Sequence, residues 1–76
     1  MKMEVIVKRR VPGTQRFVFM KYKTSSERSF FEYCRRKWPD TVENGRTVSN
    51  WLYFNVFDRR TGKKISQWTK NGRFLP

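Results

Sequence analysis

Apolar and polar residues alternate at the start of the chain, and a period of two is typical of β-strands. In residues 3–9 the valines at positions 5 and 7 share one parity, and residues 16–23 show a second alternating run. Between the two runs, Pro12 and Gly13 occupy the central positions of residues 11–14 as a type II turn requires. The first third of the chain therefore predicts a β-hairpin.

The period then changes to that of a helix, which we predict over residues 25–37. Residues spaced one, three and four apart form one apolar stripe: Phe30, Phe31, Cys34 and Trp38. Thr24 followed by Glu27 has the form of a capping box at the start of this helix. Pro39 ends it, because proline disfavours the α region for the preceding residue and has no backbone N–H to donate.

The second half of the chain reads as a polar connection followed by another hairpin. Residues 39–50 are polar, and their Asn44-Gly45 pair favours a tight turn within a small irregular hairpin. A strand over residues 51–58 follows, and Gly62 fits the left-handed position of the next turn. A returning strand leads to a last Asn-Gly turn, after which Phe74 and Leu75 are expected to fold onto one end of the core.

Aromatic and aliphatic side chains occupy both parities of residues 51–58. We predict that the inner row faces the helix and comprises Leu52, Phe54 and Val56. The outer row, which one helix cannot cover, would then display Trp51, Tyr53 and Phe57. One face of the sheet is therefore expected to be open.

These elements predict an α+β fold in a small single domain spanning residues 1–76. The order is ββαββ, in which an antiparallel β-sheet of two hairpins has one helix packed on one face. A chain of 76 residues buries only about 60% of its unfolded surface, so one thin core is expected. We predict this core to contain Phe30, Phe31, Cys34, Trp38, Leu52, Phe54, Val56 and Ile65.

Residues 16–22 have the aromatic alternation of the RNA-recognition-motif signature, with Phe17, Phe19 and Tyr22 at aromatic positions and a helix following. Arg16 and Val18 stand where that signature expects small residues, and no strand-helix-strand unit precedes the segment. Alternating aromatics are also what an ordinary strand shows. We therefore interpret the segment as a strand.

The balance of charge is the strongest indication of a partner. The chain has 18 Lys and Arg against 6 Asp and Glu, a formal net charge of +12. Solubility needs a net charge of only about 2 to 8 in a small domain. Such an excess opposes compactness through self-repulsion, so it indicates an anionic partner, and nucleic acid is the first candidate.

Few residues are suited to catalysis or to metal binding. Without histidine, Ser-His-Asp and Cys-His arrangements are excluded, and the six carboxylates are scattered along the chain. The single cysteine, Cys34, cannot form an internal disulfide and is expected to be a buried apolar residue. We expect no enzyme activity, no metal and no cofactor. One catalytic alternative is a ribonuclease toxin that works without histidine, through Arg, Lys and Tyr.

Nothing in the hydropathy indicates a membrane protein. The apolar stretch near the N-terminus is too short for a signal peptide, and no segment approaches the roughly 18 apolar residues of a membrane span. A free thiol suits a reducing compartment. The expectation is a soluble cytoplasmic protein with no membrane partner.

Aromatic residues next to basic ones form the best candidate site, because bases stack on aromatic rings while Lys and Arg neutralise phosphates. The predicted nucleic-acid-binding residues are Lys8, Arg9, Arg10, Trp51, Tyr53, Phe57, Arg59, Arg60, Lys63 and Lys64; Trp68 could add stacking or belong to the core. The favoured function is a small non-enzymatic protein that binds DNA or RNA. The alternative is a protein-binding module or inhibitor. It would dock on a nucleic-acid channel or acidic surface of a larger nucleic-acid-processing enzyme, because Trp, Tyr and Arg are also frequent interface hot spots.

Overall fold

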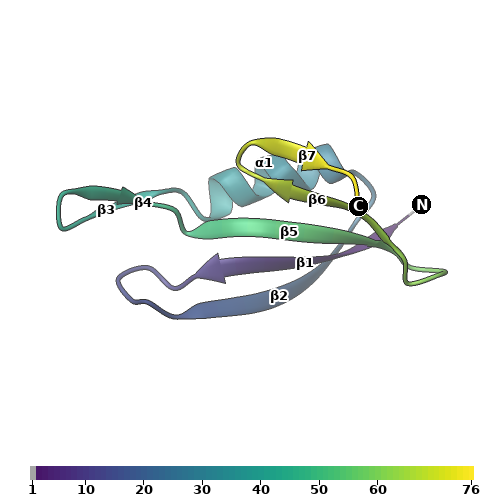
Figure 1. The fold of residues 1–76 in the computed structure, drawn as a ribbon, viewed down its shortest axis with the longest axis horizontal. Helices are drawn as coiled ribbons and strands as arrows, with labels where there is room; N and C mark the ends of the chain where they lie inside the picture. Colours follow the sequence, from purple (N-terminus) through teal and green to yellow (C-terminus); the bar gives the residue numbers. More distant parts are fainter. Residues whose placement is uncertain (1) are drawn as a thin grey trace.

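The computed structural model describes residues 2–76. It contains a five-stranded antiparallel sheet with one helix on one face, and a small separate hairpin (Figure 1). The order in the large sheet is β2-β1-β5-β6-β7, and β3 pairs with β4 apart from it. The elements are β1 (Met3–Arg10), β2 (Phe17–Thr24), α1 (Glu27–Lys37), β3 (Thr41–Glu43), β4 (Arg46–Val48), β5 (Trp51–Asp58), β6 (Lys64–Thr69) and β7 (Gly72–Phe74).

The α+β class, the helix and the antiparallel sheet are confirmed, while the order ββαββ is only partly right. The first hairpin is regular, and its eight residue pairs run without a bulge from Met3–Thr24 to Arg10–Phe17. Its turn has Gly13 at φ 80° and a hydrogen bond of 3.1 Å from the Thr14 N–H to the Val11 carbonyl. The Pro-Gly pair thus sets the register of the hairpin, as the sequence predicts.

The helix begins two residues later than predicted and is capped by a different residue. Ser26 is the N-cap, and its hydroxyl accepts a hydrogen bond of 3.2 Å from the Ser29 N–H. The predicted capping box is wrong, because the Glu27 carboxylate turns toward β6, where it accepts from the Trp68 indole N–H at 2.8 Å. The helix ends at Lys37 as predicted, and no helix within residues 2–76 is long and apolar enough to cross a membrane.

Three short strands lengthen the predicted order. The Asn44-Gly45 turn has positive φ at both residues, 52° and 76°, and joins β3 to β4 as a hairpin that projects from one end of the molecule (Figure 1). At the other edge, β7 adds a fifth strand to the sheet. The expectation that Phe74 and Leu75 fold onto the core is wrong, because they remain 49% and 71% exposed. Pairing of β7 with β6 holds this end of the chain along the sheet edge instead.

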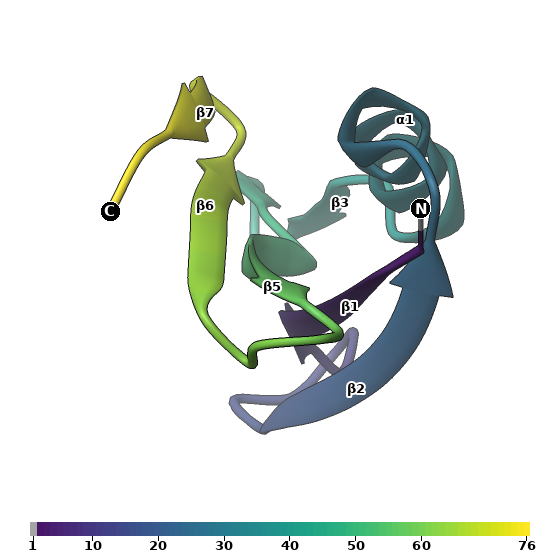
Figure 2. The same cartoon turned by 90° about the vertical axis from the view of Figure 1, so that its right-hand side faces the viewer.

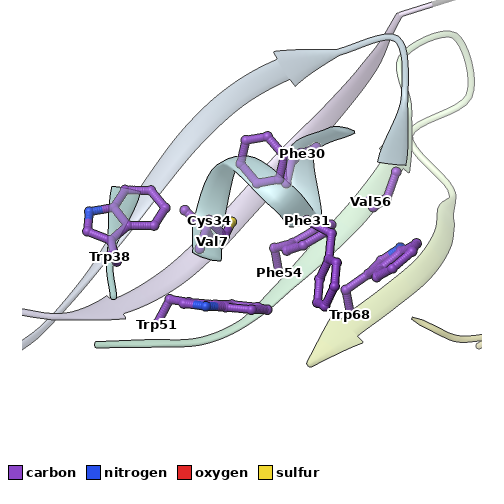
Figure 3. Close-up of a cluster of buried hydrophobic side chains, with 10 residues drawn as sticks. Val7, Phe30, Phe31, Cys34, Trp38, Trp51, Phe54, Val56 and Trp68 are labelled. Carbon is purple, nitrogen blue, oxygen red and sulfur yellow. The ribbon is translucent and has the colours of Figure 1, made fainter. Parts of the chain in front are cut away.

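The sheet curves around its core, and α1 lies on the concave side (Figure 2). Aromatic rings from the helix and sheet meet there (Figure 3); Phe30 and Phe54, for example, have centroids 4.9 Å apart at 81°. Such edge-to-face pairs contribute beyond the burial of their area. The buried core comprises Val5, Val7, Phe30, Phe31, Cys34, Trp38, Trp51, Phe54, Val56 and Trp68.

A β-bulge changes which residues of β5 face the helix. Lys8 pairs with Tyr53, but its neighbour Arg9 pairs with Trp51, so Leu52 is the extra residue. Because side chains alternate between faces, one extra residue reverses the parity before it. The prediction that Trp51 is displayed is therefore wrong: it is 1% exposed and packs in the core, while Leu52 is only half-buried. Phe54 and Val56 are buried as predicted.

Candidate nucleic-acid interface

The convex face of the sheet, opposite α1, has no element of the described chain packed on it (Figure 2). Its side chains alternate with those of the core, and cross-strand pairs such as Lys8–Phe19 and Lys8–Tyr53 join them in rows. We call this surface the open face. Its basic and aromatic members are Lys8, Phe17, Phe19, Lys21, Lys23, Tyr53, Phe57 and Lys64.

Three aromatic rings surround one lysine on the open face. The Lys8 Nζ lies 4.9 Å from the ring centroid of Phe17, 5.8 Å from that of Phe19 and 5.9 Å from that of Tyr53. A cation over an aromatic ring is attracted by the ring's quadrupole. Phe17 and Phe19 are nevertheless 48% and 62% exposed, which is unusual for phenylalanine. The result is a cluster of accessible rings around a positive charge.

The lysines of the open face lack carboxylate partners. Among residues 2–76, four salt bridges join Arg10 to Glu43, Arg35 to Glu32, Lys70 to Asp40 and Arg73 to Glu27. None of these pairs includes an open-face lysine. Five of the six acidic residues lie elsewhere, and Glu4, which pairs with Lys23 and Phe57 across the strands, is the exception. Within the described chain the open face therefore has four lysines without a salt bridge, although cations elsewhere, such as Arg28, Arg36 and Lys37 of α1, also have none.

On the helix side two basic residues, Arg35 and Arg73, have carboxylate partners. Arg35 lies 3.7 Å from Glu32, and its guanidinium is 5.8 Å from the Phe31 ring centroid. Arg73 Nε donates to Glu27 at 2.9 Å. Burial alone would raise the pKa of Glu27, but hydrogen bonds from Arg73, Ser66 and Trp68 outweigh it and lower that pKa. This side uses its charges to join the helix to β6 and β7.

The structure brings four of the predicted site residues together on the open face: Lys8, Tyr53, Phe57 and Lys64. Three more, Arg59, Arg60 and Lys63, are exposed in the loop between β5 and β6. Asp58 shapes this loop, since its Oδ1 accepts from the Arg60 N–H at 2.7 Å and from the Thr61 N–H at 3.2 Å. The loop extends beyond the end of β5 (Figure 1).

The other predicted site residues lie elsewhere. Trp51 is in the core, and so is Trp68, at 4% exposed. Arg9 faces the helix side, where its Nε donates to the Met20 sulfur at 2.9 Å and its guanidinium lies 5.7 Å from the Trp38 ring centroid. The bulge at Leu52 places Arg9 opposite Trp51 and hence on that side. These residues support the fold and are not part of the open face.

The prediction that Arg10 belongs to the binding site is also wrong, because Arg10 anchors the β3–β4 hairpin. Its guanidinium pairs with both carboxylate oxygens of Glu43 and donates to the Asn50 Oδ1 at 2.9 Å, and its side chain is 11% exposed. Glu43 also accepts from the Thr41 hydroxyl at 2.9 Å and from the Gly13 N–H at 3.0 Å. Arg10 is therefore occupied in holding two turns together.

The Glu43 carboxylate should make stability depend on pH. Hydrogen bonds from Arg10, Thr41 and Gly13 lower its pKa from 4.5 to about 2. A carboxyl whose pKa is lower in the folded state stabilises the fold above its unfolded pKa, and this contribution is lost as pH falls through the folded value. We expect Glu43→Gln to be less stable than the parent at about pH 7, with the difference shrinking between pH 4.5 and about pH 2.

Urea midpoints of the parent and of Glu43→Gln, measured side by side across that range, check this expectation. Subtraction removes the titration of the other five carboxylates, which both proteins share. A difference that stays constant as the pH falls would contradict the assigned role of Glu43.

Sequence reasoning missed half of the open face. Phe17, Phe19, Lys21 and Lys23 share one parity of β2, and that parity is exposed along its whole length. The signal was present as an alternation in which the odd positions are aromatic or basic. It points to the open face once pairing with β1 shows that Val5 and Val7 face the other way.

The described residues include little that could perform catalysis. Cys34 is buried on the core side, and burial raises the pKa of its thiol to about 12, so it is not a thiolate near neutral pH. Within residues 2–76, no three Cys, Asp or Glu side chains gather as metal ligands would. The aromatic and basic groups of the open face are suited to binding an anion.

No protein-family model, curated protein or solved structure matches this chain. The molecule is thus defined by its architecture, a small α+β domain whose antiparallel sheet has one face covered by a helix. Its function has to be inferred from the residues on the uncovered face.

Proposed function

We propose that this protein binds single-stranded nucleic acid, without catalysis, on the open face of its sheet. The observation that supports this most is the cluster of Phe17, Phe19 and Tyr53 around Lys8, in which two rings are about half exposed or more. Exposed aromatic rings next to unpaired lysines fit a ligand with flat apolar groups and regularly spaced negative charges. Nucleic acid has both properties.

Each part of the open face has a role in this proposal. Phe17, Phe19 and Tyr53 offer surfaces on which unpaired bases stack, and such stacking is tolerant of sequence. Lys21, Lys23 and Lys64, farther along the same face, neutralise phosphates of the same strand. The loop cations Arg59, Arg60 and Lys63 extend the positive surface past the end of β5.

Single strands are favoured over duplexes for two reasons. Paired bases are stacked on each other and have no free surface for an aromatic ring. The open face is also convex (Figure 2), so it would touch the cylindrical backbone of a duplex over a small area. A flexible single strand can follow a convex surface.

The electrostatic part of the proposal is tested with two variants that each remove four positive charges from a chain of formal net charge +12. One replaces the open-face lysines Lys8, Lys21, Lys23 and Lys64 by Gln, and the other replaces the helix residues Arg28, Arg35, Arg36 and Lys37 by Gln. Affinity for a single-stranded oligonucleotide is measured by fluorescence anisotropy at several salt concentrations.

We expect the slope of log affinity against log salt to become shallower by about 3 in the open-face variant, at roughly 0.7 per phosphate contact. The helix variant should keep the parental slope, because its four substituted residues do not contact the ligand. It has the same net charge as the open-face variant, so it controls for overall charge. Equal loss in the two variants would contradict the proposed site. Failure of the parent to bind DNA or RNA at low salt would instead favour an acidic protein partner.

A further inference from the structure

Strand β2 is a long, regular edge of the sheet, and within residues 2–76 no strand pairs with its outer side. It spans Phe17–Thr24 without proline or glycine, and its pairing with β1 has no bulge. The opposite edge, β7, spans only Gly72–Phe74. An edge strand presents backbone N–H and C=O groups that are free to pair with another strand, and natural proteins usually shorten, bend or cover such edges. Among the described residues the β2 edge is neither short, bent nor covered, and the lysines at positions 21 and 23 are the one kind of edge protection that it has.

We propose that β2 pairs with β2 of a second copy, antiparallel and about a two-fold axis at Met20. In that register Phe19 lies opposite the partner's Lys21, and Phe17 lies opposite the partner's Lys23. Each copy thus places its aromatic half against the basic half of the other, and no two lysines face each other. Side chains directly opposite in an antiparallel pair are in contact, and a cation beside an aromatic ring is favourable.

The alternative registers that keep the same faces together are less complementary. Pairing centred on Lys21 sets two lysines of equal charge against each other, which is destabilising. When the pairing is centred on Phe19, Lys23 lies past the partner's Phe17 and has no aromatic residue opposite it. The register centred on Met20 matches all four aromatic and basic positions of β2 in each copy, so the surface is self-complementary as a two-fold interface requires.

A hollow beside the same edge has room for a side chain of the partner strand. A pocket of about 420 Å³ lies between the end of β2 and α1, lined by residues that include Tyr22, Phe30 and Tyr33. The proposed register sets the partner's Val18 opposite Tyr22, on the helix side of the sheet. This apolar side chain therefore approaches the pocket from the second copy.

Pairing of this kind joins two sheets into one, with both helices on the same side. The two open faces then form a continuous surface, on which the lysines of one copy stand beside the phenylalanines of the other. If the proposed function holds, one single strand crosses both copies, and the dimer binds a longer segment than one chain can. The pairing itself does not require nucleic acid.

The dimer is tested on the full chain without nucleic acid, so its failure is distinct from failure of the proposed function. Sedimentation equilibrium should show a concentration-dependent dimer. Phe19→Lys places two lysines opposite each other at both symmetric contacts and should weaken the dimer about tenfold. Adding Lys21→Glu to that variant creates opposite charges across the interface and should restore the parental dissociation constant.

The matched control is Phe19→Lys combined with Lys64→Glu. It has the same net charge as the rescued variant, but Lys64 is on β6, away from the edge, so this control should remain as weak as Phe19→Lys alone. Circular dichroism and urea midpoints establish that every variant is folded. A parent protein that stays monomeric at the highest soluble concentration, or equal dimerisation of the rescued and control variants, would overturn the proposal.

Discussion

Trp51→Ala is expected to lower the free energy of unfolding by about 3–5 kcal/mol, as truncation of a large buried aromatic residue does. Trp51 is 1% exposed, and its ring lies 5.7 Å from that of Phe31 and 6.0 Å from that of Phe54, centroid to centroid. A domain of this size has little more stability than that in total. The variant should therefore be partly unfolded at room temperature.

The matched control is Tyr53→Ala, two residues along the same strand but on the open face. Its ring packs against Lys8 from the solvent side, so its removal leaves no cavity in the core. The free energies of unfolding of the two variants and the parent, measured in urea, distinguish a core residue from a surface residue. Equal destabilisation by the two substitutions would show that the bulge at Leu52 does not divide β5 as described.

Loss of two aromatic rings from the open face is expected to weaken binding of single-stranded nucleic acid. Phe19→Ala with Tyr53→Ala removes two of the three rings around Lys8, and each stacked base contributes about 1–3 kcal/mol. Affinity for a single strand should therefore fall by about 2–6 kcal/mol, while the salt slope stays near the parental value because every cation remains. Duplex affinity should change much less. Fluorescence anisotropy with single- and double-stranded oligonucleotides of one sequence measures the ratio of single-strand affinity to duplex affinity.

A suitable control is Val42→Ala, which trims another exposed apolar side chain, 73% accessible on β3, away from the large sheet. It should leave both affinities unchanged. An unchanged ratio of single-strand to duplex affinity in the double variant would remove the support for stacking.

Local sequence signals predicted the hairpin, the helix and the turns well, because each depends on residues close together in the chain. Pro12 and Gly13 define the first turn, and Asn44 and Gly45 define the turn of β3 and β4 with positive φ. The helix stripe of Phe30, Phe31, Cys34 and Trp38 is buried in full. In these segments, local preference and tertiary packing agree.

The errors come from features that sequence spacing does not report. Regular alternation through Leu52 puts Trp51 in the exposed row, but the strand has a bulge at Leu52. Nothing in the local pattern distinguishes a bulge residue from an ordinary strand residue. Once the parity is reversed, the largest side chain of β5 belongs to the core.

Arg10 shows a second kind of error. The run Lys8-Arg9-Arg10 looks like one basic patch, but strand geometry sends Lys8 and Arg9 to opposite faces, and Arg10 pairs with Glu43, 33 residues away. That contact depends on where the β3–β4 hairpin lies. The charge of a sequence therefore predicts an anionic partner, and that stays a prediction. The structure was needed to tell which cations form salt bridges that hold the fold and which do not.

An NMR titration of the isotopically labelled protein with a short single-stranded oligonucleotide tests directly whether the open face binds nucleic acid. We expect the ring signals of Phe17, Phe19 and Tyr53 to shift upfield as bases stack on them, together with changes at the amides of β1, β2 and β5. The helix residues Arg28, Arg35 and Arg36 should change little. Shifts concentrated on α1, or binding that leaves the three rings unmoved, would contradict the assignment of the open face as the binding surface.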